Sequence, residues 1–287
     1  MSETTILHLT DLHIEAETTE PFFFGSDTTT QTFRQTLDYL REHGLAPGAP
    51  IVISGDLVMY NERESYERLR GIVDEVRAEG TTVLLGLGNH DERGPFRAVM
   101  LDDEATDPAR QYYHAAMFGG LRVIVLDSST PGIHTGTVGP EQLAWLKNEL
   151  ATPAPEGTLI FVHHPPTMRA QPSLHYLSNS DQLREVVAST DVLAILSGHT
   201  HSTLISSFAD IPCVAIPGTA FITDSREDGT HLLRWAGVNV VTVRDGAVEI
   251  TAHVLPVAHE TIRVISRDDM AAATHGESSP GAEAAAE

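Results

Sequence analysis

The chain has 287 residues, 41% of them hydrophobic, so it can bury one large core or two modest ones. Its 40 acidic and 18 basic residues give a formal net charge of -22, and Lys147 is the single lysine. This charge disfavours an extended nucleic-acid-binding surface, because such a surface needs clustered lysine and arginine. The arginines from Arg63 to Arg70 are interleaved with glutamates, which is typical of a solvated helix face.

The same composition indicates a cytoplasmic protein. Residues Ser2–Thr5 lack the basic region of a signal peptide, and no apolar run reaches the length of a membrane span. Cys213 is the sole cysteine, which excludes an intramolecular disulfide and fits a reducing compartment. Because Cys213 lies within the apolar run Ile211–Ile216, we expect a buried, inert thiol.

Strand and helix signals alternate along most of the chain. The predicted strands are Ile6–Thr10, Ile51–Ser54, Thr82–Leu87, Leu121–Leu126, Leu159–Val162 and Leu193–Leu196. The predicted helices are Thr28–His43, Glu62–Glu79, Gly139–Leu150, Ser180–Ser189 and a short one at Arg97–Leu101, within residues 91–118, which otherwise read as helix and loop. Close-spaced strands follow at Ile211–Ile216, Gly237–Arg244 and Ala247–Leu255, the last two forming a hairpin around Asp245-Gly246.

Parallel βα units followed by antiparallel strands predict an α/β fold, a four-layer αββα sandwich of two mixed sheets flanked by helices. We expect one catalytic domain over residues 1–264 and a flexible tail over residues 265–287, because Met270–Glu287 is too polar to bury much surface. The segment Pro21–Gly25 contains three consecutive phenylalanines, for which a site lid, a subunit contact and core packing all remain open.

Five short apolar runs end in metal-ligating residues. The segments that follow the runs are Asp11-Leu12-His13, Gly55-Asp56, Gly88-Asn89-His90-Asp91, His163-His164-Pro165 and Gly198-His199-Thr200-His201. Because the carboxyl ends of parallel strands meet, we expect these segments to converge on one edge of a sheet. Their aspartate, asparagine and histidine side chains fit two metal ions that share one carboxylate.

The order of these segments resembles the calcineurin-like metallophosphoesterase family, whose pattern is D-x-H, G-D, G-N-H-D/E, H and G-H-x-H. The match runs from Asp11 to His201. The flanking residues in Ile51–Asp56, His163–Pro166 and Ala194–His201 are similar to the bacterial class III cyclic-nucleotide phosphodiesterase branch. The resemblance implies the metallophosphoesterase fold, which agrees with the four-layer prediction.

The resemblance also implies a ligand set. One ion would be held by Asp11, His13 and His201, and the other by Asn89, His163 and His199, with Asp56 bridging the two. In the family the ligand is the histidine two residues before the proline, so His163 is expected to bind metal and His164 to be a packed neighbour. The cofactors would be two divalent or trivalent ions, with manganese, iron, zinc and cobalt all acceptable.

The catalytic residues implied by the resemblance are His90 and Asp91. His90 and Asn89 would contact the substrate, with His90 donating a hydrogen bond to a phosphoryl oxygen or a proton to the leaving group, and Asp91 would orient the His90 ring. The alternative is that His90 only buttresses Asn89.

Other residues carry weaker expectations. His8 is expected in the core, while His114, His134, His175 and His231 are assigned to loops, with His134 and His175 as candidates for lining the pocket. Arg63, Arg93 and Arg226 are candidate phosphate or base contacts, for which an ordinary surface position is the alternative.

The reaction that the resemblance implies is hydrolysis of 3′,5′-cyclic nucleotides, above all cAMP, to 5′-monophosphates by a metal-bridging hydroxide. The partner is then a small anionic phosphodiester, not a nucleic acid, and a homodimer is left open. Two alternatives remain. The site could act on other small phosphoesters, such as glycerophosphodiesters or 2′,3′-cyclic nucleotides, or the chain could be a metal-free interaction scaffold, which the complete ligand set disfavours.

Overall fold

The computed structural model describes residues 3–16, 28–103, 107, 109–167, 176–234, 236–255 and 261–266. The predictions for Pro21–Gly25, His175 and Met270–Glu287 lie outside these ranges. The domain boundary at residue 264 therefore stays a prediction. Among the helices within these ranges, none has the length and apolar character that crossing a lipid bilayer requires.

One mixed sheet has five strands in the order β13-β12-β1-β2-β3. Strands β1, β2 and β3 run parallel, whereas β12 and β13 pair antiparallel with β1 and with each other. Their bounds are β1 Glu3–Leu9, β2 Ile51–Ile53, β3 Val83–Leu85, β12 Gly237–Arg244 and β13 Ala247–Val254.

The second mixed sheet has six strands in the order β4-β5-β6-β7-β9-β8. Its four inner strands are parallel, and the two edge strands β4 and β8 are antiparallel to their neighbours. The bounds are β4 His114–Phe118, β5 Leu121–Leu126, β6 Thr158–Val162, β7 Val192–Ser197, β8 Leu204–Phe208 and β9 Ile211–Ala215.

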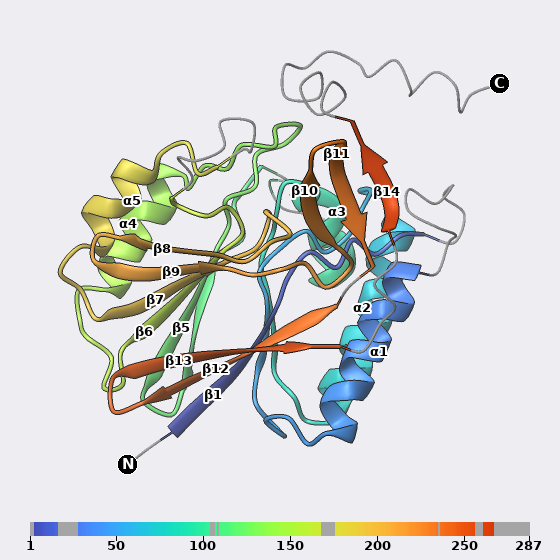
Figure 1. The fold of residues 1–287 in the computed structure, drawn as a ribbon. Helices are drawn as coiled ribbons and strands as arrows, with labels where there is room; N and C mark the ends of the chain where they lie inside the picture. Colours follow the sequence, from blue (N-terminus) through green and yellow to red (C-terminus); the bar gives the residue numbers. More distant parts are fainter. Residues whose placement is uncertain are drawn as a thin grey trace.

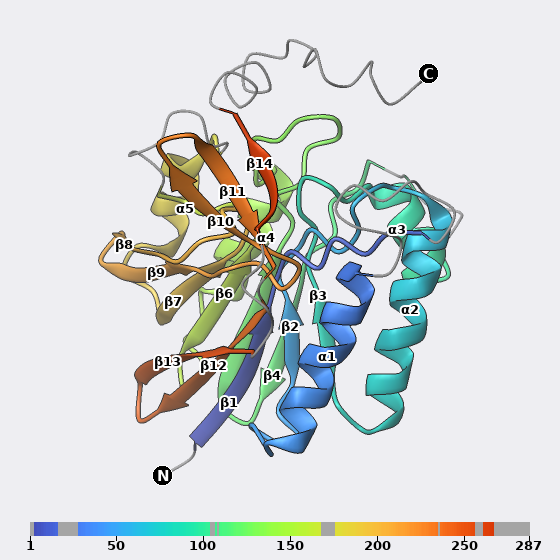
Figure 2. The ribbon, with the colours of Figure 1, turned by 45° about the vertical axis from the view of Figure 1, so that its right-hand side comes forward.

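The two sheets pack face to face, with helices on the outer face of each, as Figures 1 and 2 show. One helical layer packs on the five-stranded sheet and contains α1 Thr28–Glu42, α2 Arg63–Ala78 and α3 Arg93–Met100. The other packs on the six-stranded sheet and contains α4 Pro140–Glu149 and α5 Ser180–Val187. The predicted four-layer sandwich is confirmed.

The layers explain why the strands are apolar on both faces. In β2, Ile51 and Ile53 join the core under the helices, whereas Val52 joins the core between the sheets. In β6, Ile160 packs toward α4 and α5, and Phe161 points into the space between the sheets. A strand buried on both faces reads as a continuous apolar run, which is the pattern that made these strands predictable.

A third sheet was not predicted. It has three antiparallel strands in the order β10-β11-β14, with bounds Ile222–Arg226, Gly229–Leu233 and Thr261–Ile265. Strands β4 and β8 were also missed, so the assignment of residues 91–118 to helix and loop is wrong at β4. His114 and His231, which we assigned to loops, lie in β4 and β11. Strands β4 and β8 carry exposed residues at alternate positions, and β11 begins with Gly229, Thr230 and His231, which hides these strands in the sequence.

Candidate metal centre

The predicted ligands gather at the carboxyl ends of strands from both sheets. Asp11 and His13 follow β1, and Asp56 and Asn89 follow β2 and β3, all in the five-stranded sheet. The remaining ligands follow β6 and β7 of the six-stranded sheet, namely His163, His199 and His201. The expectation of a single sheet edge is therefore wrong, because the site lies where two packed sheets present their strand ends.

The ligand loops have an uncommon backbone conformation. The φ angle is positive at five predicted ligands: Asp11 (54°), His13 (46°), Asp56 (49°), His199 (69°) and His201 (49°). Residues other than glycine adopt this region infrequently. Each such residue costs on the order of 1 kcal/mol of folding free energy, which contacts with the surrounding structure must offset. Backbone hydrogen bonds provide such support, for example from the Asp11 and His13 amides to the carbonyls of Gly55 and Asp56.

Four side chains form a first buried cluster. The ligand atoms of Asp11, His13, Asp56 and His201 all lie within 4.8 Å of one another. Nε2 of His201 lies 3.2 Å from Asp11 Oδ1 and 3.2 Å from Nε2 of His13. The other ring nitrogen of His201, Nδ1, donates to the carbonyl of Phe221 at 3.0 Å, which leaves Nε2 as the atom that can bind a metal.

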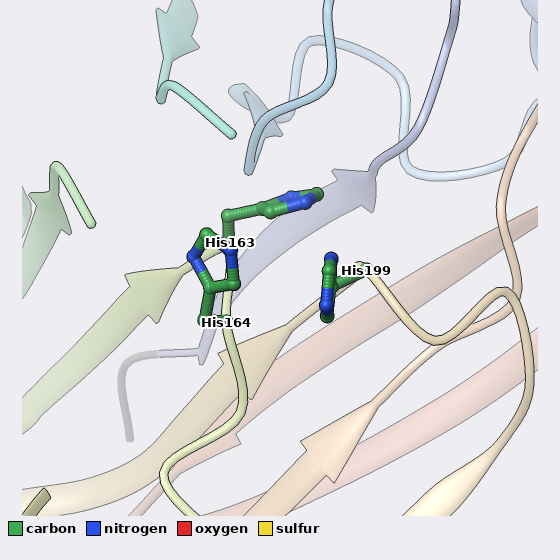
Figure 3. Close-up of side chains that lie close together, drawn as sticks. All are labelled: His163, His164 and His199. Atoms are coloured by element: carbon green, nitrogen blue, oxygen red, sulfur yellow. The ribbon is translucent and has the colours of Figure 1, made fainter. Parts of the chain in front are cut away.

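A second cluster shares Asp56 with the first. Nε2 of His163 lies 3.2 Å from Asp56 Oδ2 and 3.2 Å from Asn89 Oδ1. The rings of His163 and His199 have their centroids 5.2 Å apart, and Figure 3 shows both beside the strand ends that carry them. Carboxylate, amide oxygen and imidazole donors of this kind suit manganese, iron, zinc or cobalt.

His164 also lies in this group of histidines, with its ligand atom within 4.8 Å of those of His163 and His199. Its two ring nitrogens already have protein partners, however. Nδ1 accepts from the Ser128 hydroxyl at 2.7 Å, and Nε2 donates to the backbone carbonyl of His134 at 2.8 Å. These contacts fit the expectation that His164 is a packed neighbour of the ligands.

The electrostatics of the site centre on Asp56 and His163. Burial disfavours a charged His163, but the surrounding carboxylates, Asp56 first and then Asp11 and Asp91, together outweigh this effect and raise the pKa of His163 to about 9. Burial would raise the pKa of Asp56, yet the neighbouring imidazoles, His163 first, hold it well below its usual range. The carboxylate is therefore charged, and a metal ion bound beside it would replace the proton on His163.

Glycines in the ligand segments allow the loops to approach closely. A Cβ at Gly88 would overlap Oδ1 of Asp56, and a Cβ at Gly198 would overlap Thr10 and lie 2.5 Å from Oδ2 of Asp11. The glycines that precede Asn89 and His199 thus have a steric role beside the carboxylate ligands.

His90 lies beside the first cluster. Its ring is perpendicular to that of His13, with the centroids 4.8 Å apart, and its backbone amide donates to Asp56 Oδ1 at 2.9 Å. Its Nδ1 donates to the carbonyl of Met59 at 3.0 Å. This last contact fixes the ring orientation, a role that no property of Met59 in the sequence could have revealed.

Asp91 differs from its expected role as the partner of the His90 ring. Its buried carboxylate instead accepts hydrogen bonds from the backbone amides of Leu57, Val58 and Gly88, at 3.1, 3.3 and 2.9 Å. Burial, together with the charge of Asp56, raises the pKa of Asp91 to about 7. Asp91 therefore ties the loop that carries Asp56 to the loop that carries Asn89.

The three arginines considered as phosphate or base contacts have other partners in the structure. Arg93 is not a surface residue, because its buried guanidinium pairs with Asp127 at 2.7 Å. Arg63 and Arg226 form exposed ion pairs with Glu67 and Asp224.

Cys213 and His8 lie in the core, whereas His134 lies at the site. Cys213 is buried as expected, and burial raises the pKa of its thiol to about 12, which disfavours the nucleophilic thiolate. His8 is buried within β1 as expected, 2.9 Å from the Ser54 hydroxyl. His134 contacts Asn89 at 3.1 Å, so it lies beside the predicted ligands.

Comparisons with known proteins agree with this geometry. The chain is 35% identical over 261 residues to a probable cyclic nucleotide phosphodiesterase of Rhodococcus erythropolis, across 87% of this chain and 84% of that protein. It is 36% identical over 226 residues to a cAMP/cGMP dual specificity phosphodiesterase of Mycobacterium tuberculosis, across 76% of this chain and 68% of that protein.

A solved structure shares the fold. A purple acid phosphatase from yellow lupin seeds superposes with a TM-score of 0.57 at 14% identity, covering 97% of this chain and 56% of that chain. A family model described as calcineurin-like phosphoesterase matches residues 4–203. With the ligand segments, the four-layer sandwich and this match, the chain belongs to the calcineurin-like phosphoesterase family.

Proposed function

We propose that this chain is a phosphodiesterase that uses two metal ions to hydrolyse 3′,5′-cyclic nucleotides, with cAMP as its substrate. The observation that carries the proposal is the position of Asp56 between two groups of ligands. Its Oδ2 lies 3.7 Å from Nε2 of His13 and 3.2 Å from Nε2 of His163. This one oxygen faces both groups, while Oδ1 accepts from the His90 amide, so the Asp56 carboxylate could serve an ion in each group.

The ligands divide between the ions according to these groups. Asp11, His13 and His201 would hold one ion, Asn89, His163 and His199 would hold the other, and Asp56 would bridge them. Two ions bound in this way would supply an activated water and neutralise the phosphoryl oxygens during in-line attack. The protein contributes buried, pre-oriented donors, since Phe221 fixes the His201 ring and the His199 amide donates to Asp11 at 3.1 Å.

His90 is the residue proposed to act on the substrate. Its Nδ1 proton is engaged by Met59, so Nε2 is the ring atom that would deliver a proton to the departing ribose 3′-oxygen. Asn89 precedes it in the chain and would contact the same phosphoryl group. Asp91 is assigned a positioning role, because its carboxylate contacts backbone amides of the neighbouring loops.

A small substrate is consistent with the charge of the chain. A net charge of -22 repels polyanions, but two bound cations would reverse the sign of the field locally. Cyclic nucleotides are favoured because two relatives that align over most of this chain bear such activities in their names. A metal-free scaffold is disfavoured by the intact ligand set.

A substrate panel tests the proposal. The purified chain loaded with Mn²⁺ would be assayed with 3′,5′-cAMP, 3′,5′-cGMP, 2′,3′-cAMP, a glycerophosphodiester and 5′-AMP, with Asp56→Asn as the inactive control. We expect the highest kcat/KM on a 3′,5′-cyclic nucleotide and 5′-AMP as the product from cAMP. A higher kcat/KM on the glycerophosphodiester or on 2′,3′-cAMP would assign the site to that substrate instead.

A further inference from the structure

His134, an exposed histidine outside the predicted ligand set, contacts the Asn89 side chain. Nδ2 of Asn89 lies 3.1 Å from Nδ1 of His134, while Oδ1 of Asn89 lies 3.2 Å from Nε2 of His163. The two ends of one carboxamide thus face different partners. The nitrogen faces His134 at the rim of the site, and the oxygen faces the buried group of ligands.

The orientation of this carboxamide matters because only its oxygen can bind a cation. The oxygen and the NH₂ group of an asparagine have nearly the same size, so hydrogen bonds decide which one points inward. A flipped Asn89 would direct two N–H groups at the ion. Nδ1 of His134 accepts a hydrogen bond from the outward NH₂ group, and this contact favours the orientation in which Oδ1 points inward.

The loop that carries His134 is held by buried groups. The backbone carbonyl of His134 accepts from Nε2 of His164, whose Nδ1 contacts the Ser128 hydroxyl. His164 is fully buried, and a Cβ at Gly136 would overlap its ring. The exposed His134 is therefore anchored through its own backbone to a residue that is packed beside His163.

The base of the same loop is anchored by Arg93. Its guanidinium donates to the carboxylate of Asp127 at 2.7 Å and to the carbonyl of Ser129 at 2.6 Å, and Asp127 is fully buried. Asp127 also accepts from the amide and the hydroxyl of Ser129. These contacts fix the start of the loop after β5, and the hydrogen bond from His164 fixes its backbone at His134.

We propose that His134 is a positioning residue that orients the Asn89 carboxamide, with Oδ1 toward the ion that Asn89 shares with His163. His134 acts through Asn89 and needs no contact with the metal or the substrate. The inference rests on the two-ion site of the proposed function. It extends that site to a residue which the family motifs do not contain.

The test measures Mn²⁺ binding by the full chain after removal of metal with a chelator. In His134→Asn, Oδ1 is bonded to Cγ as Nδ1 is in histidine, so the hydrogen-bond acceptor is kept in place. In His134→Ala it is lost. We expect His134→Ala to weaken one of two Mn²⁺ binding steps by about 10- to 100-fold, the usual effect of removing a partner of a metal ligand, and His134→Asn to restore most of the affinity.

A second pair of variants isolates the amide. A carboxylate has two equivalent oxygens and no wrong orientation, so in an Asn89→Asp background the substitution His134→Ala should cost far less Mn²⁺ affinity than in the parent chain. An equal loss in both backgrounds would overturn the proposal. So would unchanged Mn²⁺ affinity in His134→Ala, or the same loss in His134→Ala and His134→Asn.

These measurements are independent of the substrate. If no cyclic nucleotide is hydrolysed, the proposed reaction fails while the Mn²⁺ titrations still report on His134. If the parent chain binds a single Mn²⁺, the two-ion proposal fails, and the affinity for that ion in the two His134 variants still decides its role. Thermal unfolding of the metal-free variants should match that of the parent, because the side chain of His134 is exposed.

Discussion

Oδ2 of Asp56 lies 3.2 Å from Nε2 of His163, although the two residues follow strands of different sheets. Asp56 comes after β2 and His163 after β6. Their contact forms where the strand ends of the packed sheets meet, above the apolar layer that contains Val52 and Phe161. The geometry of the candidate metal centre thus depends on how the two sheets pack. A carboxylate at this point lies close to predicted ligands from both sheets.

Asp56→Ala should abolish activity and lower the content of both ions, because in the proposed site this carboxylate serves both groups of ligands. Elemental analysis of the purified variant measures the metal content per chain. The matched control is Asp228→Ala, since the Asp228 side chain is 65% exposed and pairs with His231 on the small third sheet. That variant should keep both ions. Two equivalents of metal in Asp56→Ala would show that Asp56 is not the bridge.

His90→Ala should keep near-normal metal content and lose about 10²- to 10⁴-fold in kcat on cAMP, the usual contribution of a positioned acid or base. The loss should depend on the leaving group. A nitrophenolate leaves without a proton, so a bis(nitrophenyl) phosphodiester should be hydrolysed at nearly the parental rate.

Two other outcomes would revise the role of His90. Equal losses on both substrates would indicate that His90 stabilises charge on the phosphoryl oxygens. Loss of metal together with activity would indicate that His90 only supports Asn89 structurally. The exposed His43 provides the control, and His43→Ala should leave both rates unchanged.

Gly198→Ala should weaken metal binding although no ligand is changed. The added Cβ would overlap Thr10 and lie 2.5 Å from Oδ2 of Asp11, and both residues are fully buried, so neither can move without cost. Gly71→Ala is the matched control, because nothing lies within 4 Å of a Cβ there and alanine favours helix α2 by about 0.5–1 kcal/mol. The metal content and the melting temperature of both variants are measured and compared with those of the parent. Parental metal content in Gly198→Ala would contradict the steric argument.

The sandwich was predictable because most of its strands are buried on both faces and read as unbroken apolar runs, as in Thr158–Val162. The third sheet was not, because Ile222–Arg226 and Gly229–Leu233 are partly polar. Their burial depends on distant residues, since Leu232 packs with Met59 and Phe221. Propensity within a short window cannot reveal a contact of that kind.

The side chains that meet at the site were predictable from their residue types and order, whereas the groups that support them were not. The ring of His90 is oriented by the carbonyl of Met59, and that of His201 by the carbonyl of Phe221. A backbone carbonyl is present at every residue, so the identity of Met59 or Phe221 carries no signal. Asp91 was expected to accept a hydrogen bond from the His90 ring. Its donors are instead the backbone amides of Leu57, Val58 and Gly88, and no residue type in the sequence indicates them.

His8 should make the stability of the fold sensitive to acid. This histidine is fully buried, contacts the Ser54 hydroxyl at 2.9 Å and packs edge-on against Phe161. Burial lowers its pKa to about 3, whereas an exposed histidine in the unfolded chain titrates near about 6.5. Between these values the unfolded chain binds the extra proton. Stability from His8 is therefore fully present above about pH 6.5 and is lost as the pH falls toward 3, by up to about 1.4 kcal/mol per unit.

His8→Gln tests this dependence, because glutamine can keep the contact with Ser54 but does not titrate. Urea unfolding of the metal-free parent and the variant at pH 7, 6, 5 and 4 gives the free energy of unfolding at each pH. The variant is expected to be less stable than the parent at pH 7 and to lose less stability on acidification. His43→Gln, at an exposed histidine, should keep the acid-induced loss of stability that the parent shows. If the parent and His8→Gln lose stability in parallel between pH 6 and pH 4, His8 is not the group that takes up the proton on unfolding.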